Sequence, residues 1–286
     1  MTFDVMIGNP PYNKGLDINF MSLAVNMNTR IISFILTAKW LLAEQNRTIN
    51  SINCGELRDA YIKHVSKITY FPCSKDVFDI MQSEGVVSFI YNKDNSCKEC
   101  EITNICNENT YYNSVVKRSI NNKEPLLNVV YSVIKDMNIH YSFRFNSVLN
   151  KRYQVWINGK TPGGGFYSLN ESRGKMIVLG KARIIDTYNN ESSVADSKLE
   201  FSSDSIDECK SFISFLDTKL VRFLVLGCIG KLSNIMTEDN FRYVPYTDDF
   251  SFIYTDEYMY KKYNISAEQI EIIDNTIKDR SQLNEV

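Results

Sequence analysis

The chain has 286 residues, of which 44% are hydrophobic, 12% aromatic and 23% charged, with 12 glycines, 6 prolines and a formal net charge of −2. This composition is typical of a folded globular protein and excludes collagenous and intrinsically disordered chains. No apolar run approaches the ~18 residues that a membrane-spanning helix needs, so we expect no membrane partner. The length suffices for one large domain or two ordinary ones, and we expect two.

The first third of the chain alternates strand-like and helix-like segments. Residues 3–7 form a short apolar run that ends at Gly8, and residues 30–37 are apolar and β-branched, as in a central parallel strand. Helices are predicted at 20–27, 40–45 and 54–65, and further strands at 67–71 and 86–91. This order predicts an α/β domain over residues 1–115, built on a partial Rossmann-like sheet whose strands are mostly parallel.

Beyond about residue 115 the pattern changes to short strands and capped helices. Strand-like segments at 153–157 and 176–179 are separated by Gly, Asn and Ser, and the glycines at 163–165 mark the clearest break. Capping-box patterns begin at Ser205 and at Ser266, and they predict a long packed helix and a terminal helix. Residues 116–286 are therefore predicted to form a mixed α+β domain with C-terminal helices.

The seven cysteines are odd in number and irregularly spaced, which argues against a disulfide framework and favours a reducing, cytoplasmic setting. Cys97, Cys100 and Cys106 look like half of a zinc site. No second cysteine pair follows them, and His64 and His140 lack ligand spacing. We expect free thiols and no metal, with a zinc site as the alternative.

Charge is distributed unevenly along the chain. Residues 117–183 carry twelve basic and three acidic side chains, a net charge of +9, whereas residues 184–286 carry ten basic and nineteen acidic ones, a net charge of −9. A basic segment favours a polyanionic partner such as nucleic acid, because Lys and Arg contacts to phosphate supply most of that affinity. The alternative is that the acidic last third folds against the basic segment and cancels its charge.

The most specific pattern is FDVMIGNPPYN at residues 3–13. If Asn9 to Tyr12 follow the first strand, they lie where open α/β sheets bind ligands. The Asn9 amide oxygen and the Pro10 carbonyl then form a rigid acceptor pair, since each proline fixes its own φ and extends the preceding residue. Two acceptors can hold both protons of a nucleobase amine and favour a pyramidal nitrogen that attacks an electrophile. The Tyr12 ring can stack on a flipped base, typically worth ~1 to 3 kcal/mol.

The bare Asn-Pro-Pro string also fits a rigid turn after an edge strand, without any chemistry. The longer pattern, an apolar strand and then Gly-Asn-Pro-Pro-Tyr, resembles the catalytic motif of the N6-adenine DNA methyltransferases. It is most similar to the γ-class enzymes of type II restriction-modification systems, in which a target-recognition domain follows the catalytic domain. The resemblance implies that Asn9, Pro10, Pro11 and Tyr12 are catalytic and that the substrate is a flipped adenine in double-stranded DNA.

The resemblance continues along most of the chain. Residues 31–42 are similar to the family's next strand and its Pro-Ser-Arg-Trp segment, although Thr-Ala-Lys replaces the usual Pro-Ser-Arg. Residues 77–89 resemble its Gly-Gly-Val-x-Tyr-Phe block, with Glu84 in place of the first Gly, and imply that Phe89 is the second face of a base-stacking clamp.

The C-terminal part also resembles the family, at residues 153–165, 217–224, 241–245 and 255–263. The resemblance implies that residues 116–286 are the DNA target-recognition domain and that the basic segment contacts DNA. The expected DNA-binding residues are Arg144, Lys151, Arg152, Lys160, Arg173, Lys175, Lys181 and Arg183.

The family's donor-binding element is missing from this sequence. Its members bind the methyl donor S-adenosylmethionine on a Phe-x-Gly-x-Gly turn, which precedes Asn-Pro-Pro-Tyr in the γ class, and only eight residues precede Asn9 here. The glycines at 163–165 lack a strand-turn-helix context, so no cofactor-binding residue is assigned.

Three hypotheses follow for the missing element: a split enzyme whose donor-binding half is a separate chain, a truncated fragment, or a noncatalytic DNA-binding or specificity component. We favour the first two, because Asn9, Pro10 and Tyr12 are intact. A half sheet is expected to expose a strand edge and an apolar face that a partner chain would cover.

Overall fold

The chain divides into two compact units, residues 1–131 and 132–286. The computed structural model describes residues 3–43, 46–74, 77–78, 85–107, 112–120, 124–137, 143–145, 151–158, 168–170, 175–179, 183–189, 198–229 and 238–277. The predicted boundary at residue 115 falls inside strand β8 (Ser114–Arg118). Because β8 pairs with β7 in the first unit's sheet, the first unit extends further than predicted.

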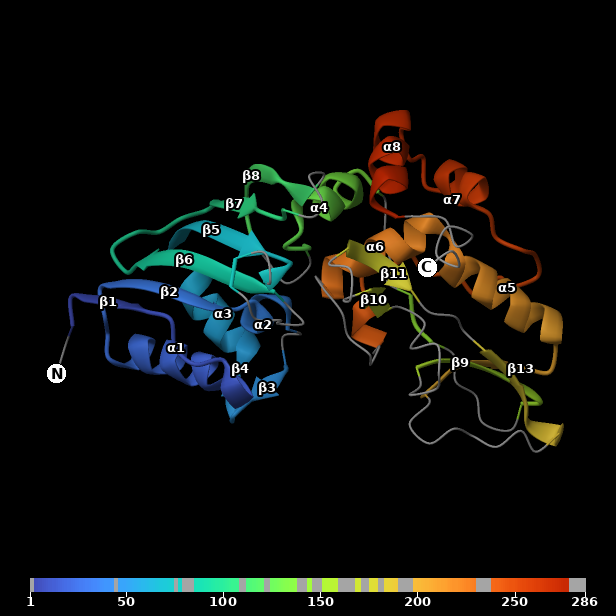
Figure 1. Ribbon diagram of the computed structural model, residues 1–286, viewed down its shortest axis with the longest axis horizontal. Helices are drawn as coiled ribbons and strands as arrows, with labels where there is room; N and C mark the ends of the chain where they lie inside the picture. Colours follow the sequence, from blue (N-terminus) through green and yellow to red (C-terminus); the bar gives the residue numbers. More distant parts are fainter. Residues whose placement is uncertain are drawn as a thin grey trace. The chain divides into compact units, whose positions relative to one another are not determined.

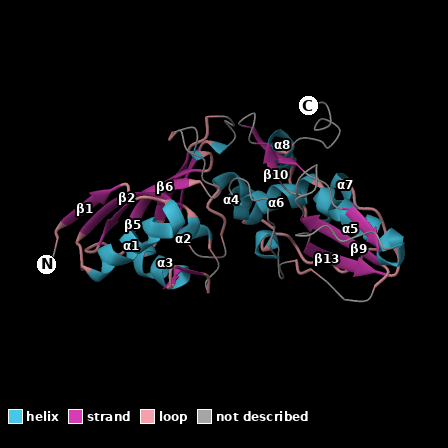
Figure 2. Ribbon diagram, turned by 60° about the horizontal axis from the view of Figure 1, so that its bottom comes forward, coloured by secondary structure: helices cyan, strands magenta, loops and turns pink. Residues whose placement is uncertain are grey.

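A six-stranded sheet in the order β1-β2-β6-β5-β7-β8 forms the centre of the first unit (Figure 1). The other strands are β1 (Val5–Gly8), β2 (Ile31–Thr37), β5 (Val65–Phe71), β6 (Val86–Asn92) and β7 (Cys100–Asn104). Helices α1 (Leu16–Asn26), α2 (Lys39–Leu42) and α3 (Cys54–Ile62) lie along one face of the sheet (Figure 2). The short pair β3 (Thr48–Ile49) and β4 (Ile52–Asn53) precedes α3, and α4 (Asn128–Ile134) follows β8.

The sheet is mixed, so the prediction of mostly parallel strands is wrong. Pairs β1–β2 and β5–β7 are parallel, whereas β2–β6, β5–β6 and β7–β8 are antiparallel. Parallel neighbours need a crossover connection, which α1 provides between β1 and β2. An apolar run carries no information about strand direction, which depends on the connection and the partner.

The core of the first unit lies between the sheet and its helices. Along β2, Ile32, Phe34 and Leu36 are buried, and the residues between them are half-buried until the strand ends. This alternation indicates a strand with one fully buried face, not the two expected of a central parallel strand. The rings of Trp40 and Tyr61 pack within this core, 6.0 Å apart.

The second unit contains two antiparallel sheets and four α-helices among its described residues. Strand β9 (Tyr153–Asn158) lies between β12 (Arg183–Asp186) and β13 (Lys198–Ser203), and β10 (Ser168–Asn170) pairs with β11 (Lys175–Leu179). The helices are α5 (Ile206–Asp217), α6 (Lys219–Ile229), α7 (Asp256–Lys262) and α8 (Ala267–Thr276). In the described parts of both units, no helix has the length and apolarity required to cross a membrane.

Aromatic rings form the core of the second unit, where α5 packs on β13 and β9. Phe201 of β13 stacks on Phe212 of α5, with ring centroids 4.6 Å apart and an interplanar angle of 13°. The predicted long helix is two helices, because Thr218 has an extended ψ of 144° that ends α5. A carboxylate oxygen of Asp256 then accepts a hydrogen bond from the Lys219 amide at 2.6 Å and satisfies the start of α6.

The two predicted capping patterns differ in outcome. The Ser266 hydroxyl accepts a hydrogen bond from the Gln269 amide and the Gln269 side chain accepts one from the Ser266 amide, so this capping box is complete. At the start of α5, the Ser205 hydroxyl accepts from the Glu208 amide, but the Glu208 carboxylate bonds the Ser203 hydroxyl instead of closing the box.

Replacing Gly85 by alanine should destabilise the protein, because Gly85 has a φ of +73° and an added Cβ would lie 2.5 Å from the Phe71 carbonyl oxygen. Left-handed strain alone costs roughly 1 to 3 kcal/mol. Gly8→Ala is the control, since its Cβ would meet the Phe34 ring at an ordinary 3.5 Å. Urea unfolding should show a loss only for Gly85→Ala, and equal stabilities would contradict the prediction.

Candidate functional site

The Asn9–Tyr12 loop begins directly after β1, at the carboxyl end of a strand that pairs in parallel with β2. The last residue of β1, Gly8, lies opposite Phe34 of β2. The loop is therefore carried by the sheet at the edge where α/β proteins bind ligands, as the sequence predicted.

The four predicted catalytic residues form a compact loop. Asn9 and Pro11 are exposed, Tyr12 is half-buried and Pro10 is buried. The Tyr12 hydroxyl donates a hydrogen bond to the Asn9 side-chain oxygen at 2.6 Å. An amide oxygen has two lone pairs, so Asn9 can accept a second hydrogen bond while it holds Tyr12. This contact orients the Asn9 amide, and sequence reasoning did not predict it.

The end of the loop has a constrained backbone. Lys14 and Gly15 have φ angles of 51° and 76°, both in the left-handed region. A Cβ added to Gly15 would lie 2.6 Å from the Ile49 methyl group, and the Asn50 side-chain amide donates to the Lys14 carbonyl at 2.8 Å. The turn into α1 thus depends on a glycine and on packing from residues far along the chain.

Phe89 belongs to the core and not to a base-stacking clamp. Its side chain is 2% exposed, and its ring packs at 5.5 Å from Trp40 and 5.9 Å from Tyr61. The ring of a core residue on the helix-covered side of the sheet offers no open face to a base. The structure corrects the prediction, because alternation along β6 turns Phe89 inward.

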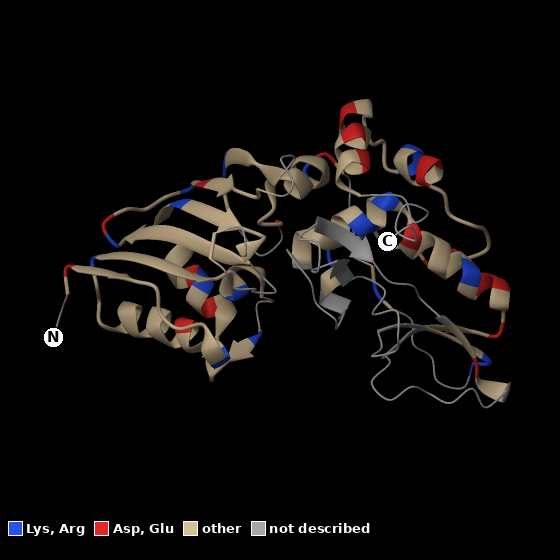
Figure 3. Ribbon diagram, in the orientation of Figure 1, with Lys and Arg blue, Asp and Glu red and all other residues tan. Residues whose placement is uncertain are grey.

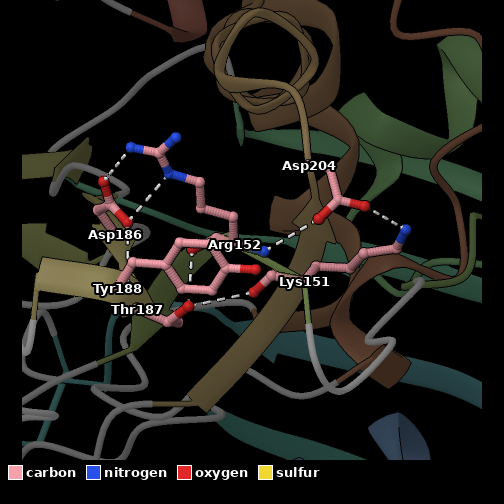
Figure 4. A network of polar contacts seen from close by, with 6 residues as sticks. All are labelled: Lys151, Arg152, Asp186, Thr187, Tyr188 and Asp204. Carbon is pink, nitrogen blue, oxygen red and sulfur yellow. Dashed lines mark hydrogen bonds and ion pairs between the residues drawn. The ribbon is translucent and has the colours of Figure 1, made fainter.

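Two predicted DNA-binding cations are held by acidic side chains of the second unit (Figure 4). Lys151 pairs with Asp204 at 2.5 Å, and Arg152 pairs with Asp186 at 3.1 Å. The hydrogen bond from Arg152 lowers the pKa of Asp186, and that from Lys151 lowers the pKa of Asp204. Both carboxylates therefore stay ionised and paired at neutral pH.

These pairs form part of a larger polar network at the start of β9. The Arg152 amide donates to Asp204 at 3.2 Å, the Thr187 hydroxyl donates to the Arg152 carbonyl at 2.9 Å, and the Tyr188 amide donates to Asp186 at 3.1 Å. Asp186 and Asp204 come from the acidic last third, so for these two cations the charge-cancelling alternative is confirmed. Sequence reasoning did not identify the individual partners, because charge counts carry no pairing information.

Of the other six predicted DNA-binding residues, three lie within the described part of the chain. Arg144 is exposed and borders a cavity of about 520 Å³ that Lys151 also lines. Lys175 and Arg183 lie on β11 and β12, and Lys160, Arg173 and Lys181 fall outside the described residues. Both α5 and α7 carry acidic and basic residues, and α7 begins with Asp256 and Glu257 and ends with Lys261 and Lys262 (Figure 3). The structure does not gather the eight predicted residues into one described surface.

All seven cysteines are free thiols. Cys100 is buried, which raises the pKa of its thiol to about 12. Within the described ranges, no three His, Cys, Asp or Glu side chains are grouped so that they could hold a metal ion.

Comparisons with known proteins give partial matches. No protein-family model matches the chain. Over 109 residues it is 28% identical to an uncharacterized adenine-specific methylase of Mycoplasma pneumoniae, a match that covers 33% of this chain and 24% of that protein. A modification subunit of a proposed type I restriction enzyme from Vibrio vulnificus YJ016 matches with a TM-score of 0.26 and 13% identity, over 36% of this chain and 25% of that one. The matches span about a quarter of each protein's length.

Tyr12 should remain protonated above the pH at which a free tyrosine ionises. Burial, and then the negative charge of Asp17, raise the pKa of Tyr12 above 10.0. The hydroxyl donates to Asn9 only below that pKa, so the contact should persist through neutral pH and be lost in strong base. Fluorine NMR of protein labelled with 3-fluorotyrosine measures the midpoint, with the resonance assigned by its loss in Tyr12→Phe. A midpoint at or below that of free 3-fluorotyrosine would contradict the prediction.

Proposed function

We propose that the chain supplies the catalytic loop and the target-recognition part of a site-specific DNA adenine N6-methyltransferase of the γ-class, restriction-modification type. The observation that carries the proposal is the Asn9–Tyr12 loop, which lies at the carboxyl end of β1 with the Asn9 amide oriented by Tyr12. The similarity to an adenine-specific methylase supports the same reaction.

In the proposed reaction, Asn9 and the Pro10 carbonyl accept the two protons of a flipped adenine's exocyclic amine. Holding both protons favours a pyramidal nitrogen whose lone pair attacks the methyl group of the donor. Pro11 keeps the Pro10 backbone extended, and the Tyr12 ring stacks on the base. Tyr12 is half-buried, so part of the residue is accessible to solvent.

S-adenosylmethionine is the proposed methyl donor, and we propose that a separate chain supplies the half that binds it. The open edge of β1 supports this partner, since β2 is the strand that pairs with β1 among the described residues. Val5 and Ile7 are 51% and 78% exposed there, and Leu23 of α1 is 51% exposed. At the opposite edge of the sheet, β8 carries Lys117, the kind of charged side chain that protects an edge from pairing. The β1 edge lacks such protection among its four residues.

We propose that the second unit binds the duplex DNA substrate. Arg144 is an exposed basic residue beside a cavity. Lys151 and Arg152 reach phosphate only by leaving their carboxylate partners. The pairing lowers the net positive charge that this unit offers to DNA. Phosphate contacts are therefore expected to be fewer than the eight predicted residues imply.

Methyl transfer should require Asn9 when a donor-binding chain is present. The experiment combines this protein with a separately expressed methyltransferase half that carries a Phe-x-Gly-x-Gly turn, and follows tritium transfer from labelled S-adenosylmethionine to unmethylated phage DNA. Asn9→Ala should lower the rate by about 100-fold or more, because it removes one of two acceptors for the reacting amine. Activity retained in that variant would refute the assigned role.

A matched pair of edge variants tests where the donor-binding chain docks. Ile7→Lys places a charge on the open edge of β1, and Val115→Lys, at a position that is 61% exposed on β8, is its control. Only Ile7→Lys should abolish activity of the mixture while leaving the protein folded. Salt-sensitive DNA binding without methyl transfer under every partner condition would instead favour a noncatalytic DNA-binding component.

Asp204→Asn should strengthen DNA binding, because it releases Lys151 from its ion pair. The slope of log K against log salt should steepen by about one for each additional phosphate that the protein neutralises. Asp207→Asn is the control, since Asp207 pairs with Lys210, which lies outside the predicted DNA-binding set. Fluorescence anisotropy with a labelled mixed-sequence duplex measures both. An unchanged affinity in Asp204→Asn would remove Lys151 from the DNA-binding residues.

A further inference from the structure

The segment from Gly8 to Asp17, which contains the Asn9–Tyr12 loop, is attached at both of its ends to one strand, β2. At its beginning, Gly8 pairs with Phe34. At its end, Asp17 in the first turn of α1 accepts hydrogen bonds from the Thr37 amide at 3.1 Å and from the Thr37 hydroxyl at 2.6 Å. Phe34 and Thr37 are three residues apart on β2, so a single strand sets the distance between the two ends of the loop.

Asp17 is a buried carboxylate in the first turn of α1. Its side chain is fully buried, as is that of Thr37. Only one carboxylate oxygen, Oδ2, makes the two bonds to Thr37, and the other, Oδ1, has no hydrogen-bond partner in the described part of the chain. A buried acceptor without a partner costs stability, so a carboxylate optimised for the fold alone would not be left in this state.

Asp17 also acts on the loop through its charge. Tyr12 lies close enough for the Asp17 carboxylate to help raise the pKa of the Tyr12 phenol. The same side chain therefore fixes the end of the loop mechanically and favours the protonated Tyr12 that donates to Asn9. Asn50 and Gly15 shape the turn between Tyr12 and Asp17, whereas Asp17 makes the bonds to β2.

We propose that Asp17 is a positioning residue of the catalytic loop, which holds the first turn of α1 on Thr37 so that Asn9 and Tyr12 keep a fixed place above the end of the sheet. The proposal rests on the proposed methyltransferase function. Asp17 touches neither the base nor the donor in this role; it acts through the loop. A small displacement of groups that orient a reacting atom can cost about 100-fold in rate.

The test uses two variants that remove either the charge of Asp17 or its hydrogen-bond donor, and a third variant as a control. Asp17→Asn keeps the shape and removes the charge, and Thr37→Val keeps the charge and removes the hydroxyl donor. Asp94→Asn is the control, because it removes an exposed carboxylate that pairs with Arg30 in the same unit. Thermal unfolding shows whether each variant folds, and Thr37→Val keeps the proposal testable if Asp17→Asn does not.

The decisive readouts are the kinetics of the two-chain mixture and the fluorine signal of Tyr12. For Asp17→Asn and Thr37→Val we expect kcat to fall about 10-fold to 100-fold, with KM for DNA within about two-fold of the wild type. The Tyr12 resonance should shift in both variants, and its titration midpoint should fall in Asp17→Asn. Asp94→Asn should leave both unchanged.

Two other results would each overturn one of the proposals. Wild-type kcat per folded molecule and an unchanged Tyr12 resonance in both variants would overturn the positioning role and leave Asp17 as a fold residue. If the wild-type mixture transfers no methyl group, the proposed function fails instead. The Tyr12 resonance then still decides whether Asp17 positions the loop.

Discussion

The parallel pairing of β1 with β2 is the interaction on which the candidate site depends. It places the end of β1 beside Phe34 and leaves Asn9 at the carboxyl edge of the sheet, while α1 provides the crossover that makes the pairing parallel. The pairing also brings Thr37 within reach of Asp17. Without it, neither the end of β1 nor the first turn of α1 would be held against β2.

Two basic side chains of the second unit are paired with carboxylates that are distant in sequence. Lys151 and Arg152 come from the basic middle third, and Asp204 and Asp186 come from the acidic last third. The Lys151–Asp204 pair is exposed, and exposed ion pairs add little stability and weaken in salt, whereas Asp186 in the other pair is part-buried. They reduce the positive charge that Lys151 and Arg152 present at the surface of this unit.

Much of the secondary structure could be predicted from local patterns. The strands at β1, β2, β5 and β6 and helix α3 overlap the segments that apolar runs and periodicity predicted, and Ser266 caps α8 as its pattern predicted. Helix α1 begins at Leu16, before the predicted start at residue 20, so its first turn was missed. Strand direction, the break at Thr218 and the role of Phe89 could not be predicted. Each depends on a contact with a residue distant in sequence. Strand direction depends on the paired strand, the start of α6 on the Asp256 carboxylate, and the burial of Phe89 on the helices that cover the sheet.

The sequence by itself determined the chemistry that the loop can perform, because Asn, two prolines and Tyr in succession present acceptors and a ring whatever surrounds them. Only the tertiary structure decided which contacts hold that loop and which basic side chains are paired with carboxylates. The Tyr12 contact to Asn9 and the Asp17 contact to Thr37 join groups whose distance is set by chain folding. The pairing of Lys151 with Asp204 has the same origin, since a salt bridge between residues 53 positions apart forms only when the sheet brings them together.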